Sequence, residues 1–197
     1  MLQAFKEYLQ TKTSISDEQF QRITEGVVTR KIKKDSVLLK KGDVTSYTFF
    51  VMKGLLRAYS IDEQGKEHVI QFAPENNWVG DRNSFCFNEP AIFIVDAIED
   101  SEVVCIDQHF FERTGQHAPQ FNRFNVIALN NLIRFMQRRV NLLLSATAEQ
   151  RYLDFIELYP SLTLRVPQWM IASYLGITPE SLSRVRKELA KRNFKSI

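Results

Sequence analysis

The chain has 197 residues, of which 44% are hydrophobic and 25% are charged, and its formal net charge is +3. This length is enough for a substantial core and a second small domain. No run of about 18 apolar residues and no signal-peptide pattern occurs, so we expect a cytoplasmic protein with no membrane partner. The two cysteines, Cys86 and Cys105, form no Cys-x-x-Cys pair, which argues against a structural metal or an iron–sulfur site.

The N-terminal part is predicted to begin with a helix and to continue as a sheet. Ser16 and Gln19 can form a capping box ahead of Phe20 and Ile23. Short runs rich in Val, Ile, Phe and Tyr follow, separated by Gly and Asp turns, at 37–39, 48–52, 55–61, 68–72, 93–98 and 102–106. Residues 62–65, Asp-Glu-Gln-Gly, predict a hairpin. Many short strands with Gly turns predict an antiparallel sandwich or barrel.

A long helix is predicted from about 120 to 146. Its apolar residues alternate steps of three and four, which fits a seam that pairs with the same helix of a second copy. The seam consists of Leu129, Leu132, Met136, Val140 and Leu143. A homodimer is the expected consequence. The alternative is an amphipathic helix that packs only on its own domain. The spacing of apolar residues alone does not distinguish a seam this short from such a helix.

Residues 167–195 predict two short helices around a tight turn. Pro167 fits a helix start, Gly176 ends the first helix, Thr178 can cap the second, and Pro179 fits its first position. The second helix has a narrow apolar stripe that is expected to face inward, formed by Leu182, Val185 and Leu189. Its other sides carry hydroxyl and cationic groups, which suit a DNA major groove.

The charges are unevenly distributed. Residues 1–117 hold 14 Lys and Arg against 18 Asp and Glu, whereas residues 118–197 hold 12 against 5. Only the C-terminal part is therefore expected to approach a polyanion such as double-stranded DNA. The alternative is that the helix pair never touches DNA, because Gly-containing helix pairs are common and a basic final helix can be a solvated surface.

Four passages carry a family resemblance. They are FFVMKGLLRAYSIDEQGKEHVIQF at 49–72, VGD at 79–81, AEQRYLDFIEL at 148–158 and GITPESLSRVRKEL at 176–189. Together with the order of sheet, long helix and terminal helix pair, they resemble the Crp/Fnr family of bacterial transcription regulators over nearly the whole chain.

The resemblance implies an α+β fold. An N-terminal antiparallel β-roll, which is a double-stranded β-helix or jelly roll, is expected to precede a long dimerisation helix and a C-terminal helix-turn-helix. The expected parts are a cyclic-nucleotide-binding-like effector domain at 1–117, the dimerisation helix at 118–147 and the DNA-binding domain at 148–197. No hairpin is evident before Ile197, so we expect the wing of winged relatives to be reduced or absent.

The resemblance also assigns roles within the predicted recognition helix. Glu180 and Arg184 match two of the family's base-reading positions, whereas Pro179 stands at the position of the first Arg, so the base code is expected to differ in part. We expect base contacts from Glu180, Ser181 and Arg184. Backbone phosphates are expected to meet Gln168, Arg186, Lys187 and Lys191.

The residues at the family's nucleotide-binding positions differ from those of relatives that bind cyclic AMP. By resemblance, the effector pocket is expected at Gly80, Asp81, Arg82, Ala91, Ile92, Met136 and Gln137. Ala91 and Ile92 replace the Arg-Ser pair that neutralises the cyclic phosphate in relatives that bind cyclic AMP. Because a buried phosphate without its cation is costly, we do not expect cyclic AMP in the usual pose. An unidentified small-molecule effector and ligand-free action both stay open, and no cofactor is expected.

Other functional classes have weaker support. His68, His109 and His117 each stand alone, which disfavours haem, and the chain has no His-x-His metal set, P-loop or Gly-x-Ser-x-Gly elbow. We therefore expect a homodimeric, sequence-specific DNA-binding transcription regulator that is not an enzyme. Its candidate partners include a small-molecule effector and RNA polymerase. The alternative is a small-molecule-binding or protein-interaction roll with a vestigial DNA-binding module.

Overall fold

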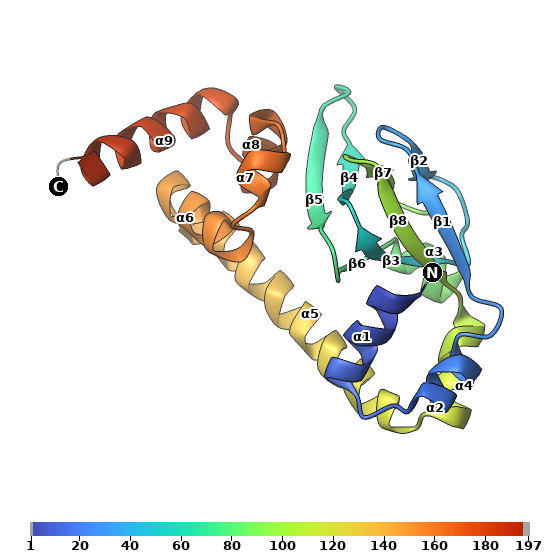
Figure 1. Cartoon of the computed structure of the whole chain (residues 1–197). Helices are drawn as coiled ribbons and strands as arrows, with labels where there is room; N and C mark the ends of the chain where they lie inside the picture. Colours follow the sequence, from blue (N-terminus) through green and yellow to red (C-terminus); the bar gives the residue numbers. More distant parts are fainter. Residues whose placement is uncertain (1, 195–197) are drawn as a thin grey trace. The chain divides into compact units, whose positions relative to one another are not determined.

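Two four-stranded antiparallel sheets form the N-terminal part of the chain in the computed structural model, which describes residues 2–194 (Figure 1). The first sheet has the order β1 (Val28–Ile32), β8 (Ser101–Ile106), β3 (Thr48–Lys53) and β6 (Trp78–Val79). The second has the order β2 (Val37–Leu39), β7 (Ile94–Ala97), β4 (Leu56–Ile61) and β5 (Glu67–Ala73), so β5 is an edge strand.

The contacts divide the chain into two units. The first comprises the residues up to 60 together with 70–131, and the second comprises 61–69 together with the residues from 132 onward. The tip of the β4–β5 hairpin is therefore part of the second unit. The long helix α5 (Gln120–Ser145) contributes to both units. The domain boundaries expected from the sequence, at 117/118 and 147/148, stay a prediction.

Strand alternation builds the core of the first unit. Phe49 and Val51 of β3 belong to an apolar cluster with residues of the second sheet, such as Leu56 and Val95. Phe50, between Phe49 and Val51, belongs to a second cluster. Successive strand side chains point to opposite faces, so a strand covered on both faces reads as a continuous apolar run.

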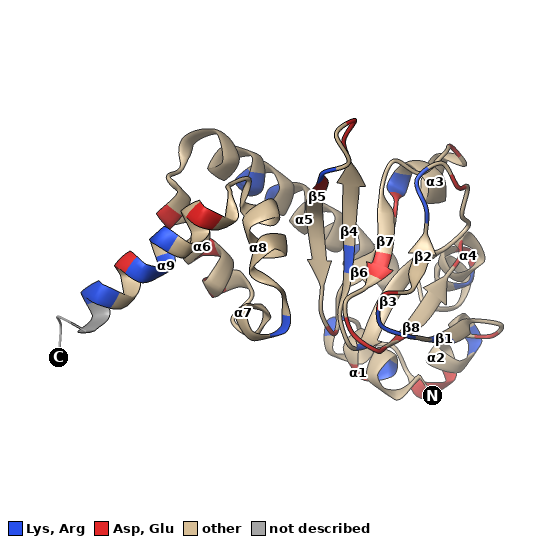
Figure 2. Cartoon of the chain, turned by 90° about the horizontal axis from the view of Figure 1, so that it is seen from above, with Lys and Arg blue, Asp and Glu red and all other residues tan. Residues whose placement is uncertain are grey.

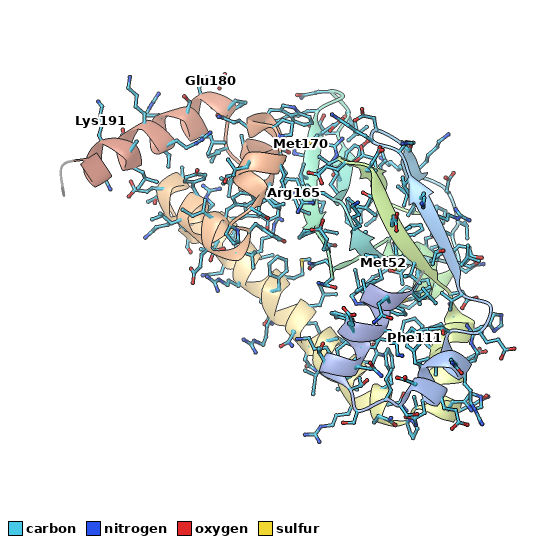
Figure 3. The ribbon with its side chains drawn as sticks, viewed as in Figure 1. Met52, Phe111, Arg165, Met170, Glu180 and Lys191 are labelled. Atoms are coloured by element: carbon cyan, nitrogen blue, oxygen red, sulfur yellow. The ribbon has the colours of Figure 1, made fainter. Side chains whose placement is uncertain are left out.

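The second cluster is aromatic and joins the sheet to helices. Phe50 packs against Phe5 of α1 (Gln3–Lys12), with ring centroids 4.8 Å apart, and Phe110 packs against Phe121 at 5.7 Å. Phe110 lies in α4 (Gln108–His117), and Phe121 lies in the first turn of α5. Phe111 and Met52 are partly buried against the same cluster (Figure 3). Two short helices complete this unit, namely α2 (Asp17–Ile23) and α3 (Arg82–Phe87).

Four helices follow α5 within the described part of the second unit. They are α6 (Ala148–Leu158), α7 (Leu162–Arg165), α8 (Gln168–Leu175) and α9 (Pro179–Phe194). Their shared core contains Phe155, Ile171 and Leu182, each at most 2% exposed. No strand follows β8 up to residue 194, so the described chain contains no wing hairpin.

The expected antiparallel sheets, long helix and terminal helix pair are confirmed. Each of the six predicted strands is present within one residue at either end, and Ser16 and Gln19 form the predicted capping box. The strands β1 and β6 were not predicted from the sequence. The strand β1 has charged residues at Arg30 and Lys31, and β6 has two residues, so neither shows a clear apolar pattern.

A buried ion pair joins β4 to β7. Arg57 donates from Nε and Nη2 to the two carboxylate oxygens of Asp96, both at 2.8 Å, and its guanidinium lies 4.0 Å from the centroid of the Tyr59 ring. The side chains of Arg57 and Asp96 are 6% and 13% exposed. Removal of either partner would leave a charge buried without its counter-ion.

We predict that Asp96→Ala lowers the free energy of unfolding by about 3–5 kcal/mol, because the buried Arg57 loses its carboxylate counter-ion. Urea denaturation followed by circular dichroism measures this change. Glu102→Ala is the control, since Glu102 pairs with Lys31 at 3.7 Å on the surface, and should cost about 0–1 kcal/mol. Equal losses for the two variants would contradict the structural role of the buried pair.

Candidate nucleic-acid interface

The turn between α8 and α9 is fixed by a glycine and a threonine. Gly176 has φ +65° in the left-handed region, and the next residue, Ile177, donates its N–H to the Ala172 carbonyl at 3.0 Å. A left-handed glycine and such a backbone hydrogen bond are the usual C-terminal cap of an α-helix, so α8 ends here. Thr178 Oγ1 accepts from the Ser181 N–H at 3.2 Å, which caps α9 as predicted, with Pro179 at its first position.

The helix α9 has an apolar side and a polar side. Leu182 and Val185 are 0% and 8% exposed, so the predicted stripe faces inward. The opposite side carries residues spaced four, three and four apart, which places them in one row along the helix. This row consists of Glu180, Arg184, Lys187 and Lys191, all of them exposed. Figure 2 shows the Lys and Arg residues along α9.

Glu180 and Lys191 mark the two ends of this row (Figure 3). Glu180 lies in the first turn of α9, where its own backbone N–H and the Thr178 hydroxyl lower the pKa of its carboxyl. The carboxylate is therefore ionised at neutral pH and can accept a hydrogen bond from a donor such as the amino group of cytosine. The cations follow at the three later positions of the row.

The remaining expected contact residues lie beside this row. Ser181 and Arg186 are partly buried, and the Ser181 hydroxyl accepts from Thr178 Oγ1 at 3.2 Å. Gln168 is exposed at the first position of α8. Ser183, which was not among the contact residues expected from the sequence, is exposed next to Arg184. Its spacing from Glu180 and Lys187, three and four residues, could have indicated it.

Polar contacts hold α8 to α5 and to the hairpin tip within the second unit. Ser173 Oγ accepts from the Val69 N–H at 3.0 Å and donates to the Glu67 carbonyl at 2.8 Å. Arg139 of α5 donates from Nη2 to the carbonyls of Val69 and Tyr174, both at 3.0 Å. Because α9 packs on α8, these contacts also set the position of the exposed row.

A second pair of ionic contacts involves α6. Arg138 of α5 pairs with Asp154, and Arg192 of α9 pairs with Glu149 at 2.6 Å. The Arg192 contact ties the last turns of α9 to the start of α6. Arg192 is thus engaged within the protein, whereas Arg184, Lys187 and Lys191 point away from the apolar side.

Comparison with known proteins identifies the architecture. A family model described as a cyclic nucleotide-binding domain matches residues 29–117. The anaerobic regulatory protein of Pasteurella multocida is 26% identical over 186 residues, which cover 88% of this chain and 67% of that protein. The transcriptional activator protein FnrA of Stutzerimonas stutzeri is 28% identical over 167 residues, which cover 79% of this chain and 68% of that protein.

The fold comparison agrees. The structure of FixK2 from Bradyrhizobium japonicum superposes with a TM-score of 0.71 at 20% identity, covering 85% of this chain and 86% of that one. In sequence and in fold, the chain is similar to transcription regulators of the Crp/Fnr family. The α+β fold and the resemblance drawn from the four sequence passages are thereby confirmed.

The expected Crp/Fnr effector positions divide between the two units. In the first unit, Asp81 caps α3 and is 1% exposed. One of its carboxylate oxygens accepts from the Ser84 N–H at 3.0 Å, and the other accepts from the N–H groups of Ile92 at 2.8 Å and Phe93 at 3.0 Å. The carboxylate thus holds the loop that precedes β7, as a structural anchor.

The neighbouring effector positions carry no buried cation. Ala91 is 2% exposed and belongs to the apolar cluster between the sheets. Ile92 is 48% exposed, and Arg82 is exposed at the start of α3. A Cβ at Gly80 would lie 3.0 Å from Thr48 Oγ1, so the backbone runs close to β3 there. Met136 and Gln137 lie on α5 in the second unit.

The exposed apolar residues of α5 differ in part from the expected Crp/Fnr dimer seam. Leu129, Leu132 and Met136 are partly buried, whereas Val140 and Leu143 are exposed, and Leu143 also lies near Gly176 of the turn. Four exposed apolar side chains lie on one face, spaced by seven, seven and four residues. They are Val126, Ile133, Val140 and Leu144.

Residues 2–194 contain no helix that is both long and apolar enough to span a bilayer. The same residues contain no group of three or more His, Cys, Asp or Glu side chains that could hold a metal ion.

We predict that Gly176→Ala destabilises the second unit by about 1–2 kcal/mol, because the left-handed conformation is costly for any residue with a Cβ. The new Cβ would also meet Leu143 at 3.1 Å. Thermal unfolding followed by circular dichroism measures the loss. Gly115→Ala is the matched control: Gly115 lies inside α4 with no atom within 4 Å of its Cβ position, so alanine should stabilise by about 0.5–1 kcal/mol. A neutral Gly176→Ala would exclude a constrained turn.

Proposed function

We propose that this Crp/Fnr regulator acts as a homodimer that inserts one α9 helix of each copy into the DNA major groove. The observation that carries the proposal is the exposed row of Glu180, Arg184, Lys187 and Lys191 opposite the buried Leu182 and Val185. A helix fits the major groove, where Arg can donate to guanine and Glu can accept from cytosine. Two-fold related helices about one DNA turn apart would read a palindromic operator.

The proposal gives the residues of the row different roles. Arg184 and Glu180, in the N-terminal half of α9, would contact bases together with Ser181. Lys187, Lys191, Arg186 and Gln168 would contact phosphates, which position the protein without reading sequence. The net positive charge of residues 118–197 supports this arrangement, because phosphate contacts require cations.

We further propose that the roll acts without cyclic AMP in the family's usual pose. The buried Ala91 offers no cation to a phosphate, and the Asp81 carboxylate is occupied by three backbone N–H groups.

RNA polymerase stays a proposed partner on the strength of the family alone. The runner-up is a roll that binds a small molecule or protein beside a vestigial DNA module; absence of any selected DNA sequence would favour it.

Homodimerisation is supported by the exposed apolar face of α5. Val126, Ile133 and Val140 are 55–57% exposed, and Leu144 is 83% exposed. Their spacing of seven and four residues is that of a coiled-coil seam. A second copy that covers this face would remove the apolar side chains from water, which is the main driving force for association.

We predict that Arg184→Ala costs about 1–3 kcal/mol on an operator and relaxes base preference at one position, because a bidentate base contact is lost. Lys191→Ala should weaken binding to all duplexes alike and reduce the salt slope by about one unit. The operator is first selected from random duplexes with the wild-type protein. Fluorescence anisotropy at several salt concentrations then compares it with a scrambled duplex, and equal losses on both for Arg184→Ala would contradict the base-reading role.

We predict that Ile133→Asp or Val140→Asp converts the dimer to a monomer at micromolar concentration, because each buries a charge in the proposed seam. Light scattering coupled to size-exclusion chromatography measures the mass. Asn141→Asp is the control, since it adds the same charge one residue further along, about 100° around the helix. A wild-type protein that is monomeric, or variants that remain dimeric, would refute the assigned seam.

A further inference from the structure

A cavity lies among α5, α6 and α8, within the second unit. Its volume is about 230 Å³. Its apolar wall comes from Phe135 and Leu142 of α5, Leu158 of α6 and Leu175 of α8. None of its lining residues belongs to the exposed row of α9 or to the expected effector positions.

The polar part of the lining has an excess of cations. Arg138, Arg139 and Arg151 line the cavity together with two carboxylates, those of Asp154 and Glu157. Arg138 pairs with Asp154, so part of this charge is already balanced. The remaining lining carries more positive than negative charge, and a cavity of this composition attracts an anion.

Arg151 has a hydrogen-bonding group that is not used. Its Nη1 donates to the Leu175 carbonyl at 2.7 Å, which fixes the guanidinium at the end of α8. Its Nε is buried and has no hydrogen-bond partner among the described residues. Buried N–H groups are normally paired, so this residue of the cavity lining has donor capacity left for an acceptor. A planar guanidinium matches the two oxygens of a carboxylate.

The proposed dimer leaves this cavity accessible. Phe135 and Leu142 lie on the side of α5 roughly opposite Ile133 and Val140, because two residues along a helix correspond to about 200° of rotation. A second copy that covers the exposed apolar stripe of α5 therefore does not cover the cavity wall.

The cavity also touches the elements that position α9. Arg139 and Tyr174 line it and take part in the contact that joins α5 to α8. Leu143 and Arg151 also line it, and they are the nearest side chains to the Cβ position of Gly176, at 3.1 and 3.4 Å. An occupant would lie directly against the turn that leads into α9.

We propose that this cavity is a binding site for a small organic carboxylate with a short apolar body. The apolar part would lie against Phe135, Leu142 and Leu158, and the carboxylate would accept hydrogen bonds from the Arg151 guanidinium. The site shares no residue with the expected effector positions of the roll. Binding there would change the DNA affinity by favouring one position of the turn at Gly176.

The test uses the full-length protein and three probes, namely benzoate, hexanoate and the uncharged benzamide. Binding is measured without DNA by calorimetry and by chemical-shift changes in isotope-labelled protein, so its outcome does not depend on the proposed function. We expect benzoate or hexanoate to bind at millimolar concentration or below, at least ten-fold more tightly than benzamide. The shifts should map to α5, α6 and α8.

Two cavity variants and one control complete the design. Arg151→Gln should weaken carboxylate binding at least ten-fold, and Leu142→Trp should block it by filling the cavity. Arg134→Gln removes an exposed cation of α5 that is not part of the cavity lining, and it should have no effect on carboxylate binding. Thermal unfolding verifies that each variant is folded. Equal affinity for benzoate and benzamide, no binding of either acid at 10 mM, or shifts confined to the roll would overturn the proposal.

Discussion

The Arg139 guanidinium joins α8, the helix on which α9 packs, to the tip of the β4–β5 hairpin. Arg139 lies 3.8 Å from the centroid of the Tyr174 ring and donates to carbonyls of both α8 and the hairpin tip. Burial raises the pKa of the Tyr174 phenol, and also that of Tyr159, whose ring centroid lies 6.0 Å from that of Tyr174. Both phenols stay neutral near pH 7, so the Tyr174 ring offers a π-face to the cation. Ser173 also forms hydrogen bonds with two backbone groups of the hairpin, so α8 cannot rotate without breaking several hydrogen bonds.

The sequence was sufficient to predict the end of a helix where a single residue determines that end through a local contact. Ser16 starts α2, Gly176 ends α8 and Thr178 starts α9, each through a contact within a few residues. The strand β1 could not be found this way, because its pairing partner is β8, far along the chain, with Val28 opposite Cys105. The helix α3 was missed for a related reason: its cap, Asp81, also depends on the N–H groups of Ile92 and Phe93.

The sequence was sufficient to predict part of the candidate site, but not the contacts that position it. The row from Glu180 to Lys191 follows from helical spacing and one buried stripe, both visible in the sequence. The contact of Arg139 and Ser173 with the hairpin could not be found, because it uses backbone groups of Glu67 and Val69, which any sequence provides. The sequence did not determine which face of α5 forms the dimer seam, because apolar residues spaced by three and four occur on neighbouring faces of this helix. The structure exposes Val126, Ile133 and Leu144 on a face beside that of Leu129 and Leu132.

The different faces of α5 connect the proposed activities. One face carries the exposed apolar stripe, and another carries Arg139 and the wall of the cavity between α5, α6 and α8. Both faces belong to one continuous helix from Gln120 to Ser145. A change in how two copies pair along the stripe would therefore rotate or shift Arg139, and with it α8 and α9. Since coupling between two binding events is reciprocal, an operator that requires one spacing of the α9 helices would also tighten the dimer. By the same rule, a carboxylate in the cavity that changes the affinity for DNA would itself bind the DNA complex with an affinity changed by the same factor.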